Sequence, residues 1–192
     1  AQVSVPEGFE VHSKLMNLLR KRQSMSRQGG IDWGFGELLA FGSLLMEGVP
    51  VHMTGEDVRR ATFAQRHAVM HDQRNGSEWT PLDYLTPNQA KLSIVDSLLS
   101  EYGAMAFEYG YSVERSEGLN IWEGQFGDFA NGAQTVIDEY VSSAEQKWGQ
   151  HSGLVLLLPH GLEGQGPDHS SARIERYLQL CDQDNTRVGQ PS

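Results

Sequence analysis

Hydrophobic residues along the chain alternate between strand-like runs and helix-like spacing. Short apolar runs typical of strands occupy residues 49–53, 91–95, 119–122 and 154–158. The last run has no polar alternation, which predicts a strand covered on both faces, as in a parallel sheet that lies between helices. The pattern therefore predicts an α/β fold with three layers, in which helices flank a mainly parallel sheet.

Segments with apolar residues at helical spacing lie between these runs. Residues that suit their N-terminal caps are Asp32, Ser97 or Ser100, and Ser170 or Ser171. The longest segment, residues 126–149, is expected to form one helix, and a last helix is expected over about residues 172–181. An Asn-Gly pair at residues 75–76 predicts a hairpin between residues 68–71 and 78–80.

The two ends of the chain differ from its middle. Residues 1–30 contain Leu15, Leu18 and Leu19 at helical spacing but little other apolar surface, which predicts a linker with a short amphipathic helix. Residues 182–192 show no periodic pattern and are expected to be a tail. The α/β domain itself is expected over residues 31–181, and 192 residues suit one well-buried domain.

Composition narrows the possible partners and compartments. The formal net charge is −10, which argues against a general nucleic-acid or membrane surface. No apolar run is long enough to span a bilayer, and the start lacks the basic and apolar pattern of a secretory signal. The single cysteine, Cys181, cannot form an internal disulfide. We expect a cytoplasmic protein without nucleic-acid or membrane partners.

Residues with useful chemistry follow the expected strands, at the edge where open parallel sheets bind ligands. These residues are Glu56, Glu101, Phe126, Phe129, His160 and His169. Each has a structural alternative: a glutamate can cap or stabilise a helix start, worth about 0.5 kcal/mol, and the phenylalanines can belong to the core. The histidines can be solvated, and no metal site is expected, since His67 and His71 have no third ligand at a recognisable spacing. The residues alone thus indicate an acidic, aromatic and histidine-lined crevice.

Four stretches carry a resemblance that goes further. They are GEDVRRATFAQRHAV, SLLSEYGAMAFEYGYS, WEGQFGDFANGAQTVIDEY and LLLPHGLEGQGPDHSSARIERYLQLC. Together they closely resemble the central part of the thiamine-diphosphate-dependent first component of 2-oxoglutarate dehydrogenase, with some likeness to the 2-oxoglutarate decarboxylase type. The match runs over about residues 31–181. The resemblance implies a transketolase-like pyrimidine-binding domain, which meets a separate diphosphate-binding domain across the cofactor.

The resemblance also implies roles for the residues of the crevice. Glu101 looks like the glutamate that hydrogen-bonds a ring nitrogen of the aminopyrimidine and so helps to activate the thiazolium carbon. Phe126 and Phe129 look like the aromatic pair beside the pyrimidine, and Glu56 is added to this cofactor-binding set. His160 and His169 are similar to histidines that donate protons to the 2-oxo acid, with His160 favoured. Thiamine diphosphate is the expected cofactor, with magnesium bound by the domain that this chain lacks.

The implied function is decarboxylation of 2-oxoglutarate with transfer of the succinyl unit to a lipoyl group. The implied partners are a second subunit of a homodimer and a lipoyl-bearing acyltransferase. Nonoxidative decarboxylation or carboligation, a 2-oxoadipate dehydrogenase component and a non-catalytic interaction module are the competing hypotheses. The family's enzymes are several times longer, so we expect an isolated chain of this length to bind the cofactor poorly and to be inactive.

Overall fold

The computed structural model describes residues 4–98, 100–161, 164–182 and 184–190. Contacts group the chain into two compact units, residues 1–51 with 59–93 and residues 52–58 with 94–192. The expected domain boundaries at residues 30 and 181 stay a prediction, and the expected tail lies partly outside the described residues. No helix in the described ranges combines the length and the apolar content that a membrane crossing requires.

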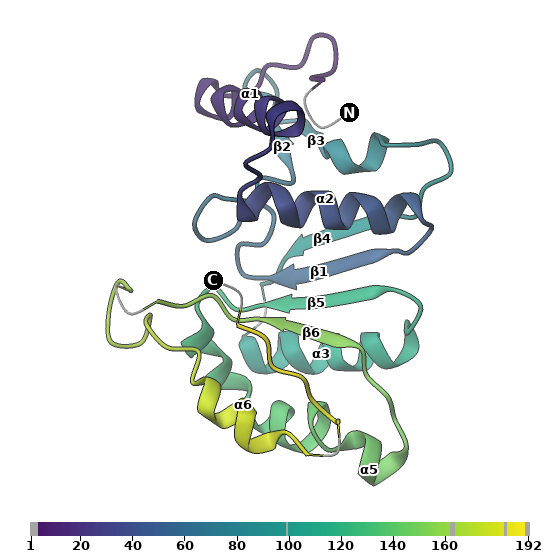
Figure 1. Ribbon diagram of the computed structural model, residues 1–192, viewed down its shortest axis with the longest axis vertical. Helices are drawn as coiled ribbons and strands as arrows, with labels where there is room; N and C mark the ends of the chain where they lie inside the picture. Colours follow the sequence, from purple (N-terminus) through teal and green to yellow (C-terminus); the bar gives the residue numbers. More distant parts are fainter. Residues whose placement is uncertain (1–3, 99, 162–163, 183, 191–192) are drawn as a thin grey trace. The chain divides into compact units, whose positions relative to one another are not determined.

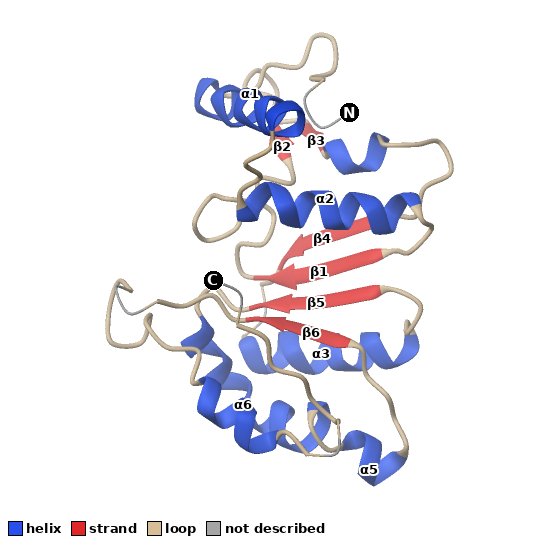
Figure 2. Cartoon of the chain, in the orientation of Figure 1, coloured by secondary structure: helices blue, strands red, loops and turns tan. Residues whose placement is uncertain are grey.

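A four-stranded sheet runs in the order β4, β1, β5, β6 (Figure 1). The strands are β4 (Leu92–Asp96), β1 (Val51–Gly55), β5 (Leu119–Glu123) and β6 (Leu154–Leu157). β5 and β6 pair in parallel, with Asn120 opposite Leu154 and Trp122 opposite Leu156. All four arrows point the same way, and helices flank the strands (Figure 2). The predicted α/β fold with a mainly parallel sheet is confirmed, with small shifts in the strand bounds.

β6 differs from the expectation of a strand covered on both faces. It lies at the edge of the sheet, with β5 as its only neighbour in that order. None of its residues is fully buried, and Val155 is 37% exposed. An apolar run marks a strand, but the order of strands decides whether that strand is central, so the prediction of full burial was wrong.

The core of the second unit lies between the sheet and helix α3 (Glu101–Glu114). Ser97 and Ser100 were the two candidates for the N-cap of α3, and Ser100 occupies this position. Its side chain makes no capping hydrogen bond. The core includes Met105, Trp122, Ala133, Val136 and Ile137, each at most 2% exposed. These residues come from α3, from β5 and from the segment that follows β5.

The single helix expected over residues 126–149 is four shorter pieces. They are η2 (Gly127–Ala133), α4 (Gln134–Val136), η3 (Ile137–Val141) and α5 (Ala144–Trp148). Glycine and asparagine favour the helical state poorly, and the first piece contains Gly127, Asn131 and Gly132. The hydroxyls of Ser142 and Ser143 donate to the carbonyl of Asp138 at 3.0 and 2.8 Å. Such local bonds compete with a regular helix, and the prediction of one helix was wrong.

The last helix, α6 (Ile174–Leu180), begins later than expected. Arg173 occupies its N-cap position in a left-handed conformation, with φ 53° and ψ 50°. Ser171 does not cap the helix, because its hydroxyl oxygen accepts the backbone N–H of Arg173 at 3.0 Å. The existence of the helix was predicted correctly, and its start was not.

The first unit contains α1 (Ser13–Gln28), α2 (Trp33–Met46) and the short η1 (Pro81–Tyr84). The carboxylate of Asp32 accepts the N–H of Phe35 at 3.0 Å, which confirms the predicted cap of α2. Arg66, 1% exposed, donates to both carboxylate oxygens of Glu37 at 2.9 and 2.7 Å. Burial lowers the pKa of the nearby Arg22 guanidinium, and the carboxylates of Asp32 and Glu37 oppose that shift.

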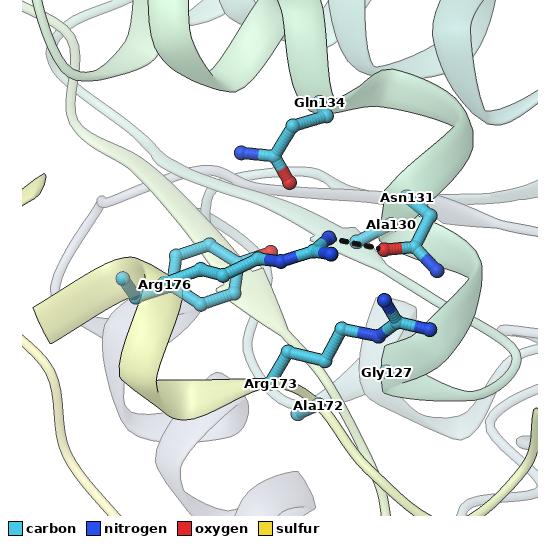
Figure 3. A pocket seen from close by; sticks show the side chains of 8 residues that line it. Gly127, Ala130, Asn131, Gln134, Ala172, Arg173 and Arg176 are labelled. Atoms are coloured by element: carbon cyan, nitrogen blue, oxygen red, sulfur yellow. Dashed lines mark hydrogen bonds between the residues drawn. The ribbon is translucent and has the colours of Figure 1, made fainter. Parts of the chain in front are cut away.

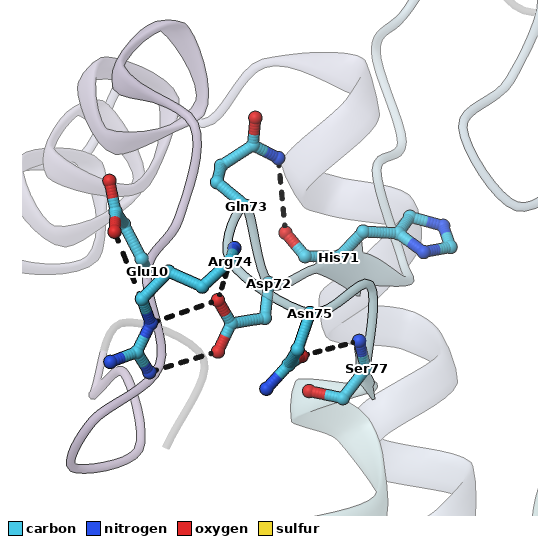
Figure 4. Close-up of polar contacts among 7 residues, drawn as sticks. All are labelled: Glu10, His71, Asp72, Gln73, Arg74, Asn75 and Ser77. Atoms are coloured by element: carbon cyan, nitrogen blue, oxygen red, sulfur yellow. Dashed lines mark hydrogen bonds and ion pairs between the residues drawn. The ribbon is translucent and has the colours of Figure 1, made fainter.

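The predicted hairpin of the first unit is present as β2 (Met70–His71) and β3 (Glu78–Trp79), which pair antiparallel. Its turn is held by local polar contacts (Figure 4). The carboxylate of Asp72 accepts the N–H of Arg74 at 2.9 Å and also its guanidinium, and these bonds lower the pKa of Asp72. Asn75 accepts the N–H of Ser77 at 2.8 Å. The turn thus satisfies its polar groups locally.

A histidine and a glutamate pair inside the second unit. Nε2 of His52 on β1 lies 3.2 and 3.0 Å from the two carboxylate oxygens of Glu108 on α3, and Glu108 is 1% exposed. The His52 ring stacks on Tyr111 with 4.1 Å between the ring centroids. The pair ties the helix to the sheet.

We expect Glu108→Ala to lower the free energy of unfolding by about 2 kcal/mol, because it leaves the half-buried His52 ring without its partner. Urea denaturation of the chain measures this. The control is Glu114→Ala, at an exposed position of the same helix, where the change should stay within about 0.5 kcal/mol. Equal effects of the two substitutions would contradict a stabilising role for the pair.

Candidate functional site

Glu101 is the first residue of α3 and is half-buried. Its carboxylate lies beside Gly132 of η2, where an added Cβ would be 3.5 Å from Oε2. Among the residues that the structure describes, this carboxylate has no hydrogen-bond or ion-pair partner. The absence of a side chain at Gly132 leaves one side of the carboxylate open. Glu101 is therefore free to bind a group that the chain does not supply.

Three rings gather at the start of η2. Phe126 and Phe129 meet edge to face with 5.8 Å between their centroids. The ring of His169 lies 4.5 Å from Phe126 and 5.1 Å from Phe129, again edge to face. Phe126 is 6% exposed, while Phe129 and His169 are half-buried. Residues some forty positions apart in the sequence thus form one aromatic cluster, with ring edges and faces arranged as aromatic quadrupoles favour.

Two contacts hold the segment of His169 against η2. The carboxylate of Asp128, 3% exposed, accepts the N–H of Ser171 at 2.9 Å. Gly127 lies close to Ala172, the residue after Ser171. A Cβ added at Gly127 would be 2.6 Å from the Cβ of Ala172. Gly127 also donates its N–H to the carbonyl of Pro159 at 2.8 Å. The positions of His169 and of the phenylalanines therefore depend on each other.

Sequence reasoning missed Gly127 and Asp128. Phe126 and Phe129 were singled out from the sequence, and the residues between them fell within the helix expected over residues 126–149. Glycine, aspartate and asparagine within a few residues are a recognised signal of an irregular turn. That signal was present and would have separated this segment from the helix that follows.

The two histidines have different surroundings. Nδ1 of His169 lies 2.6 Å from a carboxylate oxygen of Asp168, so an Nδ1–H that donates there leaves Nε2 for another partner. His160 is exposed, and its Nδ1 lies 2.9 Å from the carbonyl of Leu158, close to its own strand. The structure brings His169, rather than the favoured His160, to the phenylalanines. The catalytic role of each histidine stays a prediction.

Glu56 lies on the turn after β1 and is exposed. Residues 56–60 form turns rather than a helix, so the interpretation that Glu56 caps a helix is wrong. Its side chain makes no hydrogen bond or ion pair with the described part of the chain. Its assignment to the cofactor-binding set stays a prediction.

A small open hollow lies between η2 and the start of α6 (Figure 3). It is lined by Gly127, Ala130, Asn131, Gln134, Ala172, Arg173, Arg176 and Tyr177. Burial raises the pKa of Tyr177 to about 12. Over the described ranges, no three His, Cys, Asp or Glu side chains gather closely enough to hold a metal ion.

Comparison with known families agrees with this architecture. The family described as transketolase, pyrimidine binding domain, matches residues 29–192. The chain belongs to this family. The resemblance stated from the sequence is confirmed at the level of the domain.

Individual relatives carry related names. The 2-oxoglutarate dehydrogenase E1/E2 component of Corynebacterium glutamicum is 57% identical over 195 residues, covering all of this chain. The multifunctional 2-oxoglutarate metabolism enzyme of Mycobacterium sp. (strain JLS) is 52% identical over 198 residues, again covering the whole chain. The mitochondrial 2-oxoglutarate dehydrogenase of Saccharomyces cerevisiae is 56% identical over 182 residues, or 94% of the chain. The chain spans only 16 to 18% of the length of these relatives.

We expect Gly127→Ala to lower the free energy of unfolding by about 2 kcal/mol, because the new methyl group overlaps Ala172 and forces the two segments apart. The matched control is Gly153→Ala, since nothing lies within 4 Å of a Cβ added at Gly153. Urea denaturation of both variants gives the comparison. A Gly127→Ala chain as stable as the control would show that the close approach does not hold the site together.

Proposed function

We propose that this domain contributes the pyrimidine side of the active site of a thiamine-diphosphate-dependent 2-oxoglutarate dehydrogenase. The complete protein would decarboxylate 2-oxoglutarate and transfer the succinyl unit to a lipoyl group of a partner acyltransferase. One observation carries the proposal: the half-buried carboxylate of Glu101 has no partner among the described residues, in a domain of the transketolase pyrimidine-binding family. The names of relatives that are 52 to 57% identical support the choice of substrate.

The residues present fit the pyrimidine end of the cofactor. A carboxyl group that shares a proton with a ring nitrogen needs to be shielded from bulk water yet free of internal partners, and Glu101 meets both conditions. The Phe126 and Phe129 pair offers apolar surface for a flat ring. Thiamine diphosphate, when bound, supplies a thiazolium carbon that adds to a 2-oxo acid and accepts the electron pair released with carbon dioxide.

The chain's own residues have separate proposed tasks. Glu101 holds a proton at the edge of the pyrimidine and so favours the tautomer that can deprotonate the thiazolium carbon. Phe126 and Phe129 orient the ring and exclude water. His169, which contacts Asp168 through Nδ1, is proposed to donate a proton from Nε2 near the reacting end when its ring carries both protons. His160 is proposed to act on the substrate, and Glu56 to contact the cofactor.

We also propose that the complete protein is a homodimer. The outer side of α3 exposes apolar side chains, with Tyr102 50% and Phe107 58% exposed. Ala106 and Gly110 of the same helix are exposed as well. A helix surface with large and small apolar residues suits close packing against another protein surface. We further propose that a diphosphate-binding domain of the complete protein binds magnesium. We also propose that the protein is cytoplasmic.

A second candidate function is nonoxidative decarboxylation or carboligation of 2-oxoglutarate. The name of the mycobacterial relative describes a multifunctional enzyme of 2-oxoglutarate metabolism. Both outcomes use the same activated carbon and differ in the acceptor of the resulting group. Glu101 and the ring cluster serve either reaction, so product analysis with and without a lipoyl acceptor separates the two. A 2-oxoadipate dehydrogenase component would instead prefer the acid that is longer by one carbon, and a non-catalytic module would turn over neither acid.

Glu101→Gln is the test of the proposed function. In the complete protein, we expect hydrogen-deuterium exchange at the thiazolium carbon of bound cofactor to slow by about 100-fold, because an amide cannot share the proton. The melting temperature should change little, because the Glu101 carboxylate makes no hydrogen bond or ion pair with the described residues. An exchange rate within a few-fold of the parent at saturating cofactor would remove Glu101 from the mechanism.

The two histidines are expected to respond differently. His160→Ala in the complete protein should lower turnover of 2-oxoglutarate by about 100-fold with little change in cofactor affinity, because its proposed role is at the substrate. His169→Ala should weaken cofactor affinity as well, because its ring packs against both phenylalanines. Steady-state kinetics and calorimetric titration of thiamine diphosphate measure the two quantities. Matching losses of affinity in both variants would contradict the division of roles.

A further inference from the structure

Two arginines share one side of the hollow beside η2 (Figure 3). Arg173 precedes α6, and Arg176 lies in its first turn, three residues further along. Both long side chains extend toward Asn131 in Figure 3. Arg176 donates to the side-chain oxygen of Asn131 at 2.7 Å, which turns the amide NH₂ of Asn131 outward as a further donor. Three groups with N–H donors therefore line one shallow, open hollow on the surface.

The described part of the chain supplies no carboxylate to these arginines. None of the eight lining residues is acidic. The carboxylate of Asp138, which influences the neighbouring Tyr177, accepts the side-chain NH₂ of Gln134 at 2.8 Å. Several other arginines have acidic partners: Arg59 pairs with Glu78, Arg74 with Asp72, and Arg115 with Glu117. Arg173 and Arg176 instead line the same hollow without an acidic partner in the described ranges, although the chain contains 25 acidic residues and 15 basic ones.

The backbone of Arg173 adopts a strained conformation that neighbouring residues hold in place. Its φ of 53° lies in the left-handed region, which costs a non-glycine residue on the order of 1 kcal/mol. The N–H of Arg173 is fixed by the hydroxyl oxygen of Ser171 at 3.0 Å. Ser171 in turn donates its own N–H to Asp128. The strained residue is thus anchored to the same element, η2, that lines the opposite wall of the hollow.

We propose that Arg173, Arg176 and Asn131 bind an oxoanion, a phosphate or a carboxylate group, and that the bound anion holds the segment of His169 against η2. Planar guanidinium groups suit either oxoanion, because their N–H donors match pairs of oxygens. The anion would join α6 to η2 directly, across the contact between Ala172 and Gly127. The site lies beside the ring cluster and uses none of the residues proposed to contact the cofactor.

Calorimetric titration of the complete protein with inorganic phosphate, and separately with succinate, tests the binding. Ionic strength is kept constant with chloride, because screening weakens charge pairs of this kind. Arg173→Gly removes the guanidinium while glycine still accepts the left-handed backbone, and Arg176→Gln acts at an exposed position. Each should weaken binding of the preferred anion by about tenfold or more, as expected when a hydrogen bond to a charged group is lost. Arg115→Ala, which removes an arginine paired with Glu117, is the control and should leave affinity unchanged.

The comparison of the two probes identifies the source of the oxoanion. Tighter binding of phosphate would assign the site to phosphorylated compounds, and tighter binding of succinate to carboxylates. No saturable binding of either probe, or an equal loss of affinity in the control, would overturn the proposal.

The effect on His169 is measured independently, by the rate at which diethyl pyrocarbonate modifies this residue, followed by mass spectrometry. The rate should fall as the bound anion saturates the parent protein and should stay constant in Arg173→Gly. An unchanged rate in the parent would overturn the coupling. Neither measurement depends on turnover, so a failure of the proposed catalytic function would not alter the result of this test.

Discussion

The candidate site depends on the close approach of two backbone segments, one after β5 and one before α6. Gly127 has no side chain, and the segment that contains Ala172 occupies the space that a Cβ would need. The buried carboxylate of Asp128 then binds the N–H of Ser171, which prevents this segment from shifting along η2. With this contact in place, His169 lies against Phe126 and Phe129. Without it, the rings would belong to separate loops.

Around this contact, the second unit combines a well-packed core with charged side chains that have no partner of opposite charge among the described residues. Trp122, Met105 and Ile137 belong to a buried apolar core that packs α3 against β5. Glu101 begins that helix, so the core determines where its carboxylate lies. The carboxylate itself has no described partner, and neither arginine beside η2 has an acidic partner in the described ranges. Polar groups left open on a rigid support are what a binding site requires, because little conformational entropy is lost when a ligand arrives.

Part of the apolar surface of this chain is exposed. The chain spans 16% of the corynebacterial relative, and β6 is an edge strand with an exposed valine. The apolar side of α3 is exposed as well. Apolar surface at a sheet edge and along a helix is unfavourable in water, and its exposure here supports the proposed homodimer.

The sequence by itself determined the strands and helices, the cap at Asp32, the hairpin and the family, because these follow from local spacing and from long ordered stretches of similarity. It also placed Glu101 at the first turn of a helix. Only the tertiary structure decided that β6 lies at the sheet edge, that residues 126–149 break into pieces, and that His169 rather than His160 meets the phenylalanines. Strand order and contacts between distant segments depend on which surfaces pack together, and hydrophobic spacing along one segment contains no information about its partner.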